Sequence, residues 1–265
     1  MKKSVTQGFV TVLLFFSTWY VLQQVDWMSV FKVETVTEKT EQKLGDLFWE
    51  FFKMTEKENT NQFVINSIDS LISKICTGNS IKRAQIKFHI LDKDEVNAFA
   101  LPNKRLVIYS GLIAAVENQE ELSGVIAHEI AHIELNHVMK KLIKEVGLSV
   151  LISMTTGGGG SDIVRETAKM VSSTAFDRSL EKEADIKAVE YLIKANINPE
   201  PLANFFYKLS DNESEAIKYL SWISTHPDLK ERAEYIVEHS KGTITKTEPV
   251  LSQETWDKLK KEIEE

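Results

Sequence analysis

The chain has 265 residues, of which 43% are hydrophobic, and its formal net charge is −7. This length and composition can supply one sizeable hydrophobic core, so we expect one or two domains. The basic residues are not clustered, which argues against a nucleic-acid partner. Cys76 is the only cysteine, so an intramolecular disulfide is excluded.

The N-terminal residues predict a membrane anchor. Residues 4–25 contain no charged side chain, and as a helix they would reach about 33 Å, enough to cross a bilayer core. Lys2 and Lys3 precede this segment, which predicts a cytoplasmic N-terminus and an extracytoplasmic remainder of the chain. A cleaved signal peptide is the alternative and would leave an exported soluble protein, but no alanine before Ala84 offers the usual cleavage site.

The next segments predict core helices and a small sheet. Apolar residues recur at helical spacing in residues 37–57 and 62–76. Residues 84–91 and 105–109 have the β-branched, alternating pattern of strands, and Asn103-Lys104 supplies a tight turn before the second of them. We therefore expect a small sheet ahead of the helix described next.

His128 and His132 flank Glu129 in an H-E-x-x-H pattern. On a helix, residues four apart lie on one face, so both imidazoles can converge on one zinc ion. Zinc with three protein ligands keeps one position open for water and lowers the pKa of that water from about 16 to roughly 7. Glu129 can then accept the water's proton as general base. The pattern therefore predicts a hydrolase centre with zinc as cofactor.

The flanking residues predict that this pattern lies on a buried helix. Asn118 can cap the helix, and Glu121 stands at the capping-box position. An apolar stripe continues to Val138, so we expect the helix to run past that residue. His137 lies five residues after His132, which does not match the spacing of a third histidine ligand, and we assign it a structural role.

Residues 146–162 predict a helix hairpin rather than a membrane span. The apolar run is too short to cross a bilayer, and the glycines from Gly157 to Gly160 form a flexible tip. Because the hairpin separates the two parts of the site along the chain, we hypothesise that it gates the active-site cleft. Alanine at Gly158 and Gly159 should then change peptide cleavage.

A later acidic helix offers the third zinc ligand. Glu181 and Asp185 are four residues apart and share a helix face, whereas Glu183 points to roughly the opposite side. Ligating histidines usually donate their second N–H to an outer carboxylate. We therefore assign Glu181 to zinc and Asp185 to that outer contact. The alternative is a solvated charge run with an ordinary Glu183–Lys187 ion pair.

Together these residues resemble the membrane-associated gluzincin metallopeptidases, which include the HtpX-type heat-shock proteases and the CAAX-prenyl proteases. The likeness rests on the H-E-x-x-H residues, on Glu181-x-x-x-Asp185 and on the order of the segments from about residue 80 to 240. With one apolar N-terminal segment, the chain is most similar to the single-anchor, BepA-like branch. The family usually has Pro-Gly-Gly after the first strand, whereas this chain has Pro102-Asn103-Lys104, in which asparagine can adopt a positive φ.

The resemblance implies that Asn97, Ala98 and Phe99 form an edge strand that binds the backbone of a peptide substrate through its unpaired N–H and C=O groups. Such a strand would make the enzyme a peptidase. The alternative is an ordinary structural hairpin.

The resemblance also assigns roles to His226, which lies in a Thr-His-Pro sequence, and to Arg232. Both would donate hydrogen bonds to the oxyanion that forms at the scissile carbonyl. The alternative is a plain helix boundary at His226-Pro227, with Arg232 on a solvated face. A resting contact between His226 and zinc is a further alternative.

We expect a helix-rich α+β zincin fold in which a small sheet packs against the zinc-binding helix. Residues 1–30 would form the anchor, residues 31–240 the metallopeptidase domain, and residues 241–265 a linker and short terminal helix. The expected function is a zinc-dependent metalloendopeptidase that hydrolyses unfolded or misassembled membrane or envelope proteins. Its partners would be polypeptide substrates and the membrane, and no oligomeric state is indicated. A zinc-stabilised, chaperone-like assembly factor is the alternative, against which the general base Glu129 argues.

Overall fold

The computed structural model describes residues 33–211, 216–242 and 247–264. Contacts along the chain divide it into two units, residues 1–41 and 42–265, and the packing described below is that of the second unit. The predicted anchor, residues 4–25, lies outside the described residues. Within the described residues, the structure contains no helix with the length and apolar character needed to cross a membrane.

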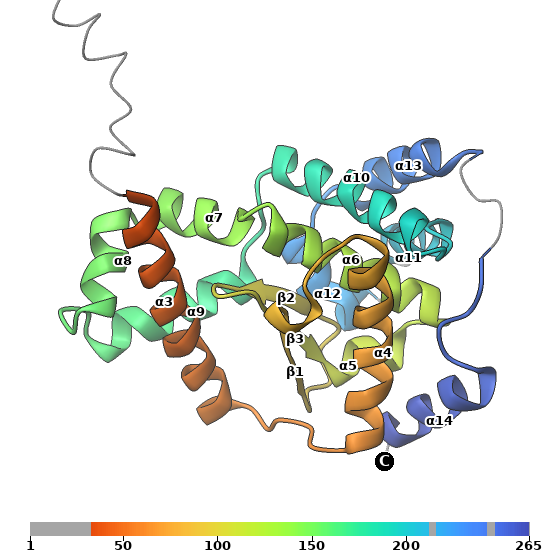
Figure 1. The fold of residues 1–265 in the computed structure, drawn as a ribbon, viewed down its shortest axis with the longest axis horizontal. Coiled ribbons are helices and arrows are strands. Elements are labelled where there is room, and N and C mark those ends of the chain that lie inside the picture. Colours follow the sequence, from red (N-terminus) through yellow and green to blue (C-terminus); the bar gives the residue numbers. More distant parts are fainter. Residues whose placement is uncertain (1–32, 212–215, 243–246, 265) are drawn as a thin grey trace, which may run out of the picture. The chain divides into compact units, whose positions relative to one another are not determined.

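Helices dominate the described chain, and a small sheet lies among them (Figure 1). The strands are β1 (Lys87–Leu91), β2 (Ala98–Leu101) and β3 (Arg105–Tyr109), and a short 3-10 helix, Arg83–Gln85, precedes them. The described α-helices are α3 (Val33–Thr55), α4 (Gln62–Gly78), α5 (Ser110–Ala115), α6 (Gln119–Glu134), α7 (His137–Glu145), α8 (Leu148–Thr155), α9 (Ser161–Ser173), α10 (Arg178–Lys194), α11 (Glu200–Asp211), α12 (Ala216–Thr225), α13 (Leu229–Ser240) and α14 (Gln253–Glu264). This confirms the predicted helix-rich α+β fold.

The sheet has the strand order β1-β3-β2, so β2 is an edge strand. β1 runs parallel to β3, whereas β2 is antiparallel to β3 with Ala98 opposite Ile108. The turn between β2 and β3 has positive φ at both Asn103 (64°) and Lys104 (53°), which is the turn that the sequence predicted. The predicted first strand is shorter than expected and begins at Lys87, because the preceding residues form the 3-10 helix.

The H-E-x-x-H residues lie on α6, whose start has the predicted cap. The Asn118 side chain accepts a hydrogen bond from the Glu121 N–H at 2.8 Å, and the Glu121 carboxylate accepts one from the Glu117 N–H at 2.8 Å. The end of the helix differs from the prediction that it would run on. Asn136 takes the left-handed conformation with φ 56°, and α7 begins at His137 in a new direction.

Packing around α6 positions the site. The sheet contacts α6 through β2 and β3, as predicted, and α10 and α11 pack along the helix. Ala127 and Ala131 on α6 and Ala184 and Ala188 on α10 are fully buried, and their short side chains let the two helix backbones approach closely. The terminal helix α14 belongs to the same unit and packs on α4 and α5, where the Lys260 ammonium donates to carbonyl oxygens at the end of α5.

The predicted helix hairpin is present and its second arm is longer than expected. α8 and α9 are joined by a turn that contains Gly157 to Gly160 (Figure 1). α9 contacts the edge strand β2 and helix α12. We call residues 148–177, which comprise α8, α9 and the segment up to α10, the cover.

Candidate metal centre

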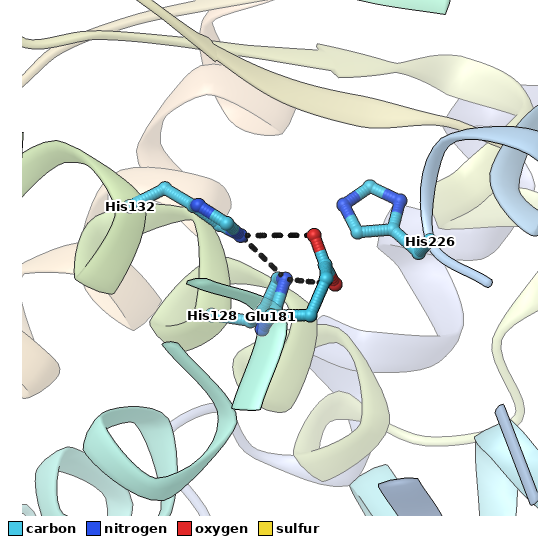
Figure 2. Close-up of side chains that lie close together, drawn as sticks. All are labelled: His128, His132, Glu181 and His226. Carbon is cyan, nitrogen blue, oxygen red and sulfur yellow. Dashed lines mark hydrogen bonds and ion pairs between the residues drawn. The ribbon is translucent and has the colours of Figure 1, made fainter. Parts of the chain in front are cut away.

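Three side chains from two helices converge at the centre of the fold (Figure 2). The Nε2 atoms of His128 and His132 on α6 lie 3.0 Å apart. The Glu181 carboxylate on α10 faces both, with one oxygen 3.6 Å from Nε2 of His128 and the other 3.5 Å from Nε2 of His132. This is the ligand set that the sequence predicted, and helix spacing within α6 together with the close packing of α10 brings it together.

The arrangement fits a zinc ion. His226, from the segment after α12, joins the other three residues, and one possible ligand atom from each of the four lies within 4.8 Å of the others. All four side chains are buried, at 2% exposure or less. Among the described residues, no hydrogen bond satisfies Nε2 of His226 or Oε1 of Glu181. Buried atoms of this kind lack a hydrogen-bond donor. Imidazole nitrogens and carboxylate oxygens are also the ligand atoms that zinc prefers.

Glu129 lies beside this cluster and is itself fully buried. Its Oε1 is 3.3 Å from Nε2 of His226, and the backbone of Ala100 in β2 lies close to its carboxyl group. Burial raises the pKa of Glu129 above its usual value, although His132 and His128 oppose this effect. A raised pKa makes a carboxylate a better proton acceptor, which is the property that a general base requires.

Asp185 occupies the outer position predicted for it. Its Oδ1 lies 2.9 Å from Nδ1 of His128, so the Nε2 of that histidine remains free for the metal. Arg232 donates two hydrogen bonds to the Asp185 carboxylate, from Nε at 2.7 Å and from one terminal nitrogen at 2.8 Å. The Tyr235 hydroxyl donates a third hydrogen bond to this carboxylate at 2.6 Å. Burial alone would raise the pKa of Asp185, but the charges of Arg232 and His128 outweigh burial and hold it well below its usual range.

Arg232 also reaches a predicted ligand. Its second terminal nitrogen lies 2.6 Å from Oε2 of Glu181, so all three nitrogens of the guanidinium face carboxylates. The resemblance had assigned Arg232 to the oxyanion, and these contacts support a different task, namely holding Glu181 and Asp185 in place. Tyr235 was not anticipated, although its position one helical turn after Arg232 was a usable signal in the sequence.

His226 is held by its neighbours on α12. The Trp222 ring stacks on it at 3.9 Å with an interplanar angle of 15°, and the Thr225 hydroxyl oxygen lies 2.8 Å from its Nδ1. The same hydroxyl donates its proton to backbone carbonyls of Ser221 and Trp222, so it accepts from Nδ1–H of the histidine. Nε2 then carries a lone pair, and burial lowers the pKa of His226 to about 3, which keeps the ring neutral. In this tautomer His226 is equipped to bind a metal.

The outer partner of His132 was missed by the sequence analysis. Its Nδ1 lies 3.1 Å from Nδ1 of His137, and Nε2 of His137 lies 3.3 Å from the Glu183 carboxylate. The Phe176 ring stacks on His132 at 4.1 Å. The sequence carried no signal for these contacts, because His137 faces His132 only as a result of the left-handed conformation at Asn136.

The predicted substrate strand is present but covered. Asn97 precedes the edge strand β2, which contains Ala98 and Phe99, and all three residues are buried. The Asn97 amide donates to the Ser172 carbonyl oxygen of α9 at 3.3 Å and to the Ser221 hydroxyl at 3.0 Å. The edge that could pair with a peptide therefore lies against the cover.

Comparison with known proteins gives a consistent family. The model of "Peptidase family M48" matches residues 64–240, which include every residue of the metal centre. The chain is 24% identical over 205 residues to a "Beta-barrel assembly-enhancing protease" of Yersinia pestis, covering 73% of this chain and 42% of that protein. It is 31% identical over 166 residues to the "Metalloprotease LoiP" of Escherichia coli K12, covering 60% of this chain and 64% of that protein.

A mitochondrial relative gives a similar match. The chain is 30% identical over 162 residues to the mitochondrial metalloendopeptidase OMA1 of Bos taurus, covering 56% of this chain and 31% of that protein. The matches to the Yersinia and bovine proteins span less than half of those proteins, so the relatives contain substantial further sequence beyond the shared part.

Proposed function

The chain belongs to peptidase family M48, whose metallopeptidases depend on zinc, and on this premise we propose that it is a zinc-dependent endopeptidase. The observation that carries the proposal is the buried cluster of His128, His132 and Glu181 with the Glu129 carboxyl group beside it. A purely structural zinc site does not require a neighbouring carboxylate that is not itself a zinc ligand. Hydrolysis, in contrast, requires a general base at that place.

Each side chain has a role that its contacts support. Zinc, when bound, supplies Lewis acidity that polarises the scissile carbonyl and lowers the pKa of water. Glu129 takes the proton of the attacking water and returns it to the leaving amine. Asp185 orients His128, and Arg232 holds Asp185 and Glu181, so that neither buried carboxylate rotates away.

The oxyanion role predicted for His226 and Arg232 requires a donor N–H that points to the reacting carbonyl. In the closed structure His226 presents a lone pair to the cluster, so it would hold a zinc ion together with His128, His132 and Glu181. We propose that this is the resting state, and that substrate takes the place of His226. Donation to the oxyanion then needs the opposite tautomer of the ring and stays a prediction.

Substrate access requires the cover to move. The candidate ligands and Glu129 are buried, and α9 contacts the strand that is proposed to pair with the peptide. We propose that opening of the cover exposes the edge formed by Asn97 and the start of β2, Ala98 and Phe99, where an extended peptide adds as a strand with its scissile bond near Glu129. An extended backbone is available in unfolded segments, so unfolded polypeptides are the substrate class that this geometry suits.

The cellular setting is likewise proposed. The names of two bacterial relatives refer to β-barrel assembly and to a metalloprotease, and residues 4–25 have the composition of a membrane-spanning helix. On these grounds we propose an anchored enzyme with its catalytic domain outside the cytoplasm, acting on misassembled envelope or membrane proteins. The chaperone-like assembly factor remains the competing function.

Glu129→Gln is the experiment that separates the two functions. The variant should retain zinc, because Glu129 is not a ligand, and should lose cleavage of an unfolded protein by about 100-fold or more. Zinc is measured by elemental analysis and cleavage by gel electrophoresis of a reduced, unfolded substrate. Equal residual cleavage in wild type and variant would favour the assembly factor. Glu181→Gln is the paired variant and should lose zinc as well as activity.

A further inference from the structure

The two histidines of the metal centre differ in what holds them. The Nδ1 of His128 faces a carboxylate directly, that of Asp185 at 2.9 Å. The Nδ1 of His132 faces another imidazole, that of His137 at 3.1 Å, and His137 is fully buried. A neighbour that contacts a ligating histidine at its second nitrogen determines the tautomer and the orientation of the ring.

The hydrogen count determines the direction of these contacts. When Nε2 of His132 binds a metal, its Nδ1 carries the proton and must donate it. Nδ1 of His137 is the atom that accepts, so the single proton of neutral His137 lies on its Nε2. That nitrogen is 3.3 Å from Oε2 of Glu183, a carboxylate on α10 that accepts the proton. One tautomer of each ring therefore satisfies both contacts.

The backbone and the neighbouring rings hold this chain of contacts in place. Asn136 takes φ 56° between α6 and α7, and the change of chain direction at this residue places His137 beside His132. Phe176 stacks on His132 at 4.1 Å with an interplanar angle of 24°, so the ring is restrained on its face as well as at its edge. The Glu183 side chain is 51% exposed, so the chain of contacts ends at the protein surface.

We propose that His137 and Glu183 are positioning residues for the metal ligand His132, forming a relay of two hydrogen bonds that does for His132 what Asp185 does for His128. The proposal rests on the metal site of the proposed function. It goes beyond that function, because neither the family assignment nor the H-E-x-x-H pattern gives a role to His137 or Glu183. Glu183, which the sequence predicted to point away from the face of Glu181, thereby acts on the metal through two imidazoles.

The relay predicts a graded loss of zinc affinity. His137→Phe preserves a ring but removes the acceptor, and should weaken zinc binding by about 10- to 100-fold. His137→Asn places an amide oxygen near the position of Nδ1 and should restore most of the affinity. Glu183→Ala should weaken zinc binding by a few-fold, whereas Glu183→Gln keeps an acceptor oxygen and should lie closer to wild type.

Zinc dissociation constants are measured on the full chain by competition with a fluorescent chelator, after circular dichroism has shown that each variant is folded. His89→Phe is the matched control, because His89 is a largely buried histidine that stacks on Trp49 away from the metal centre. Its zinc affinity should equal that of wild type. The visible spectrum of the cobalt-substituted protein gives a second readout, since reorientation of His132 changes the ligand field.

Unchanged zinc affinity and an unchanged cobalt spectrum in folded His137→Phe would overturn the relay and leave the proposed peptidase intact. If His137→Phe does not fold, Glu183→Ala decides, because its side chain is half exposed and its removal should be tolerated. Wild-type affinity in Glu183→Ala would then overturn the relay. A wild-type chain that binds no zinc would overturn the metal site and the relay together, an outcome distinct from the first.

Discussion

The metal centre and the cover are built in opposite ways. At the metal centre His128, Glu129 and Asp185 are fully buried, and the Asp185 carboxylate lies 2.9 Å from Nδ1 of His128 and 2.7 Å from Nε of Arg232. Few residues of the cover helices α8 and α9 are buried, and no side-chain hydrogen bond caps the N-terminus of either helix. Its buried helical residues are Leu151, Met154, Thr167, Ala168 and Val171.

This difference indicates which part of the site can move. A segment with few buried contacts opens at a small free-energy cost, whereas a packed and paired centre opens only when the protein unfolds. Catalysis benefits from such a division, because the ligands stay preorganised while the cover admits the substrate. The three predictions that follow test this division, first at the centre and then at the cover.

Arg232→Gln should have the largest effect. The substitution leaves the buried carboxylates of Asp185 and Glu181 without their cation, and should lower the free energy of unfolding by about 3–5 kcal/mol. Arg178→Gln is the control, because it removes an exposed ion pair with Asp228 and should cost less than about 1 kcal/mol. Both are measured by urea denaturation of zinc-free protein. Equal losses in the free energy of unfolding for the two variants would mean that the ion pairs of the metal centre stabilise the fold no more than an exposed ion pair does.

Gly159→Ala should loosen the cover. A Cβ at Gly159 would lie 2.7 Å from the Cα of Met154, one of the buried anchors, so the turn must shift. Overpacking of this kind costs about 1–3 kcal/mol, which would raise the population of the open cover by roughly 5- to 150-fold. Limited proteolysis within residues 148–177 should accelerate, and cleavage of an unfolded substrate should rise with it.

Gly160→Ala is the matched control in the same turn. No heavy atom lies within 4 Å of a Cβ placed there, and Gly160 has φ −58°, which alanine adopts readily. Its proteolysis and activity should match wild type. If Gly159→Ala also leaves both rates unchanged, the gating hypothesis is wrong. The structure also explains why Gly158 is a less decisive site, since the only close neighbour of its Cβ is the Ser153 hydroxyl, the end of a movable side chain.

Lys141→Met should have an effect no larger than that of Gly159→Ala, and the effect should depend on pH. Lys141 donates to the Thr174 carbonyl oxygen, and its ammonium lies 4.5 Å from the centre of the Phe176 ring, so it ties α7 to the end of the cover. Burial lowers its pKa to about 8, below its value in an unfolded chain. Above pH 8 the unfolded state therefore binds more protons than the folded state.

The sign of the pH dependence follows from this difference in protons. Between about pH 8 and pH 10 the free energy of unfolding of the wild type should rise relative to that of Lys141→Met, by on the order of 1–3 kcal/mol in total. Thermal unfolding of both proteins at several pH values measures the difference. A difference that is constant over this range would show that Lys141 stays charged in the folded protein and that its burial is unimportant.

Much of the metal centre could be predicted because its geometry is local. His128, Glu129 and His132 follow from the spacing of one helix, and Glu181 and Asp185 from the spacing of a second. The Asn118 cap is likewise a matter of a few neighbouring residues. Within each helix the hydrogen-bonded backbone determines which side chains share a face, so the pattern in the sequence was sufficient.

Contacts that depend on a change of chain direction or on the packing of distant helices could not be predicted in this way. His137 was assigned a structural role because its spacing from His132 does not match that of a third histidine ligand, and the left-handed residue Asn136 brings it beside His132. The guanidinium of Arg232 was expected at the oxyanion, and its contacts with two carboxylates emerge only when α13 packs on α10. Such contacts join residues far apart in the chain, and no periodicity records them.

Residue type and helical spacing were thus enough to predict the candidate ligands, the candidate general base and the carboxylate that contacts His128. Tertiary packing decided how these groups are held, through the contact of His137 with His132 and the ion pair of Arg232 with Asp185. It also decided whether a substrate can reach them, through the position of α9 against β2. The physical reason is that helix geometry is set by hydrogen bonds between residues four apart, whereas the burial that closes the site is set by the whole core at once.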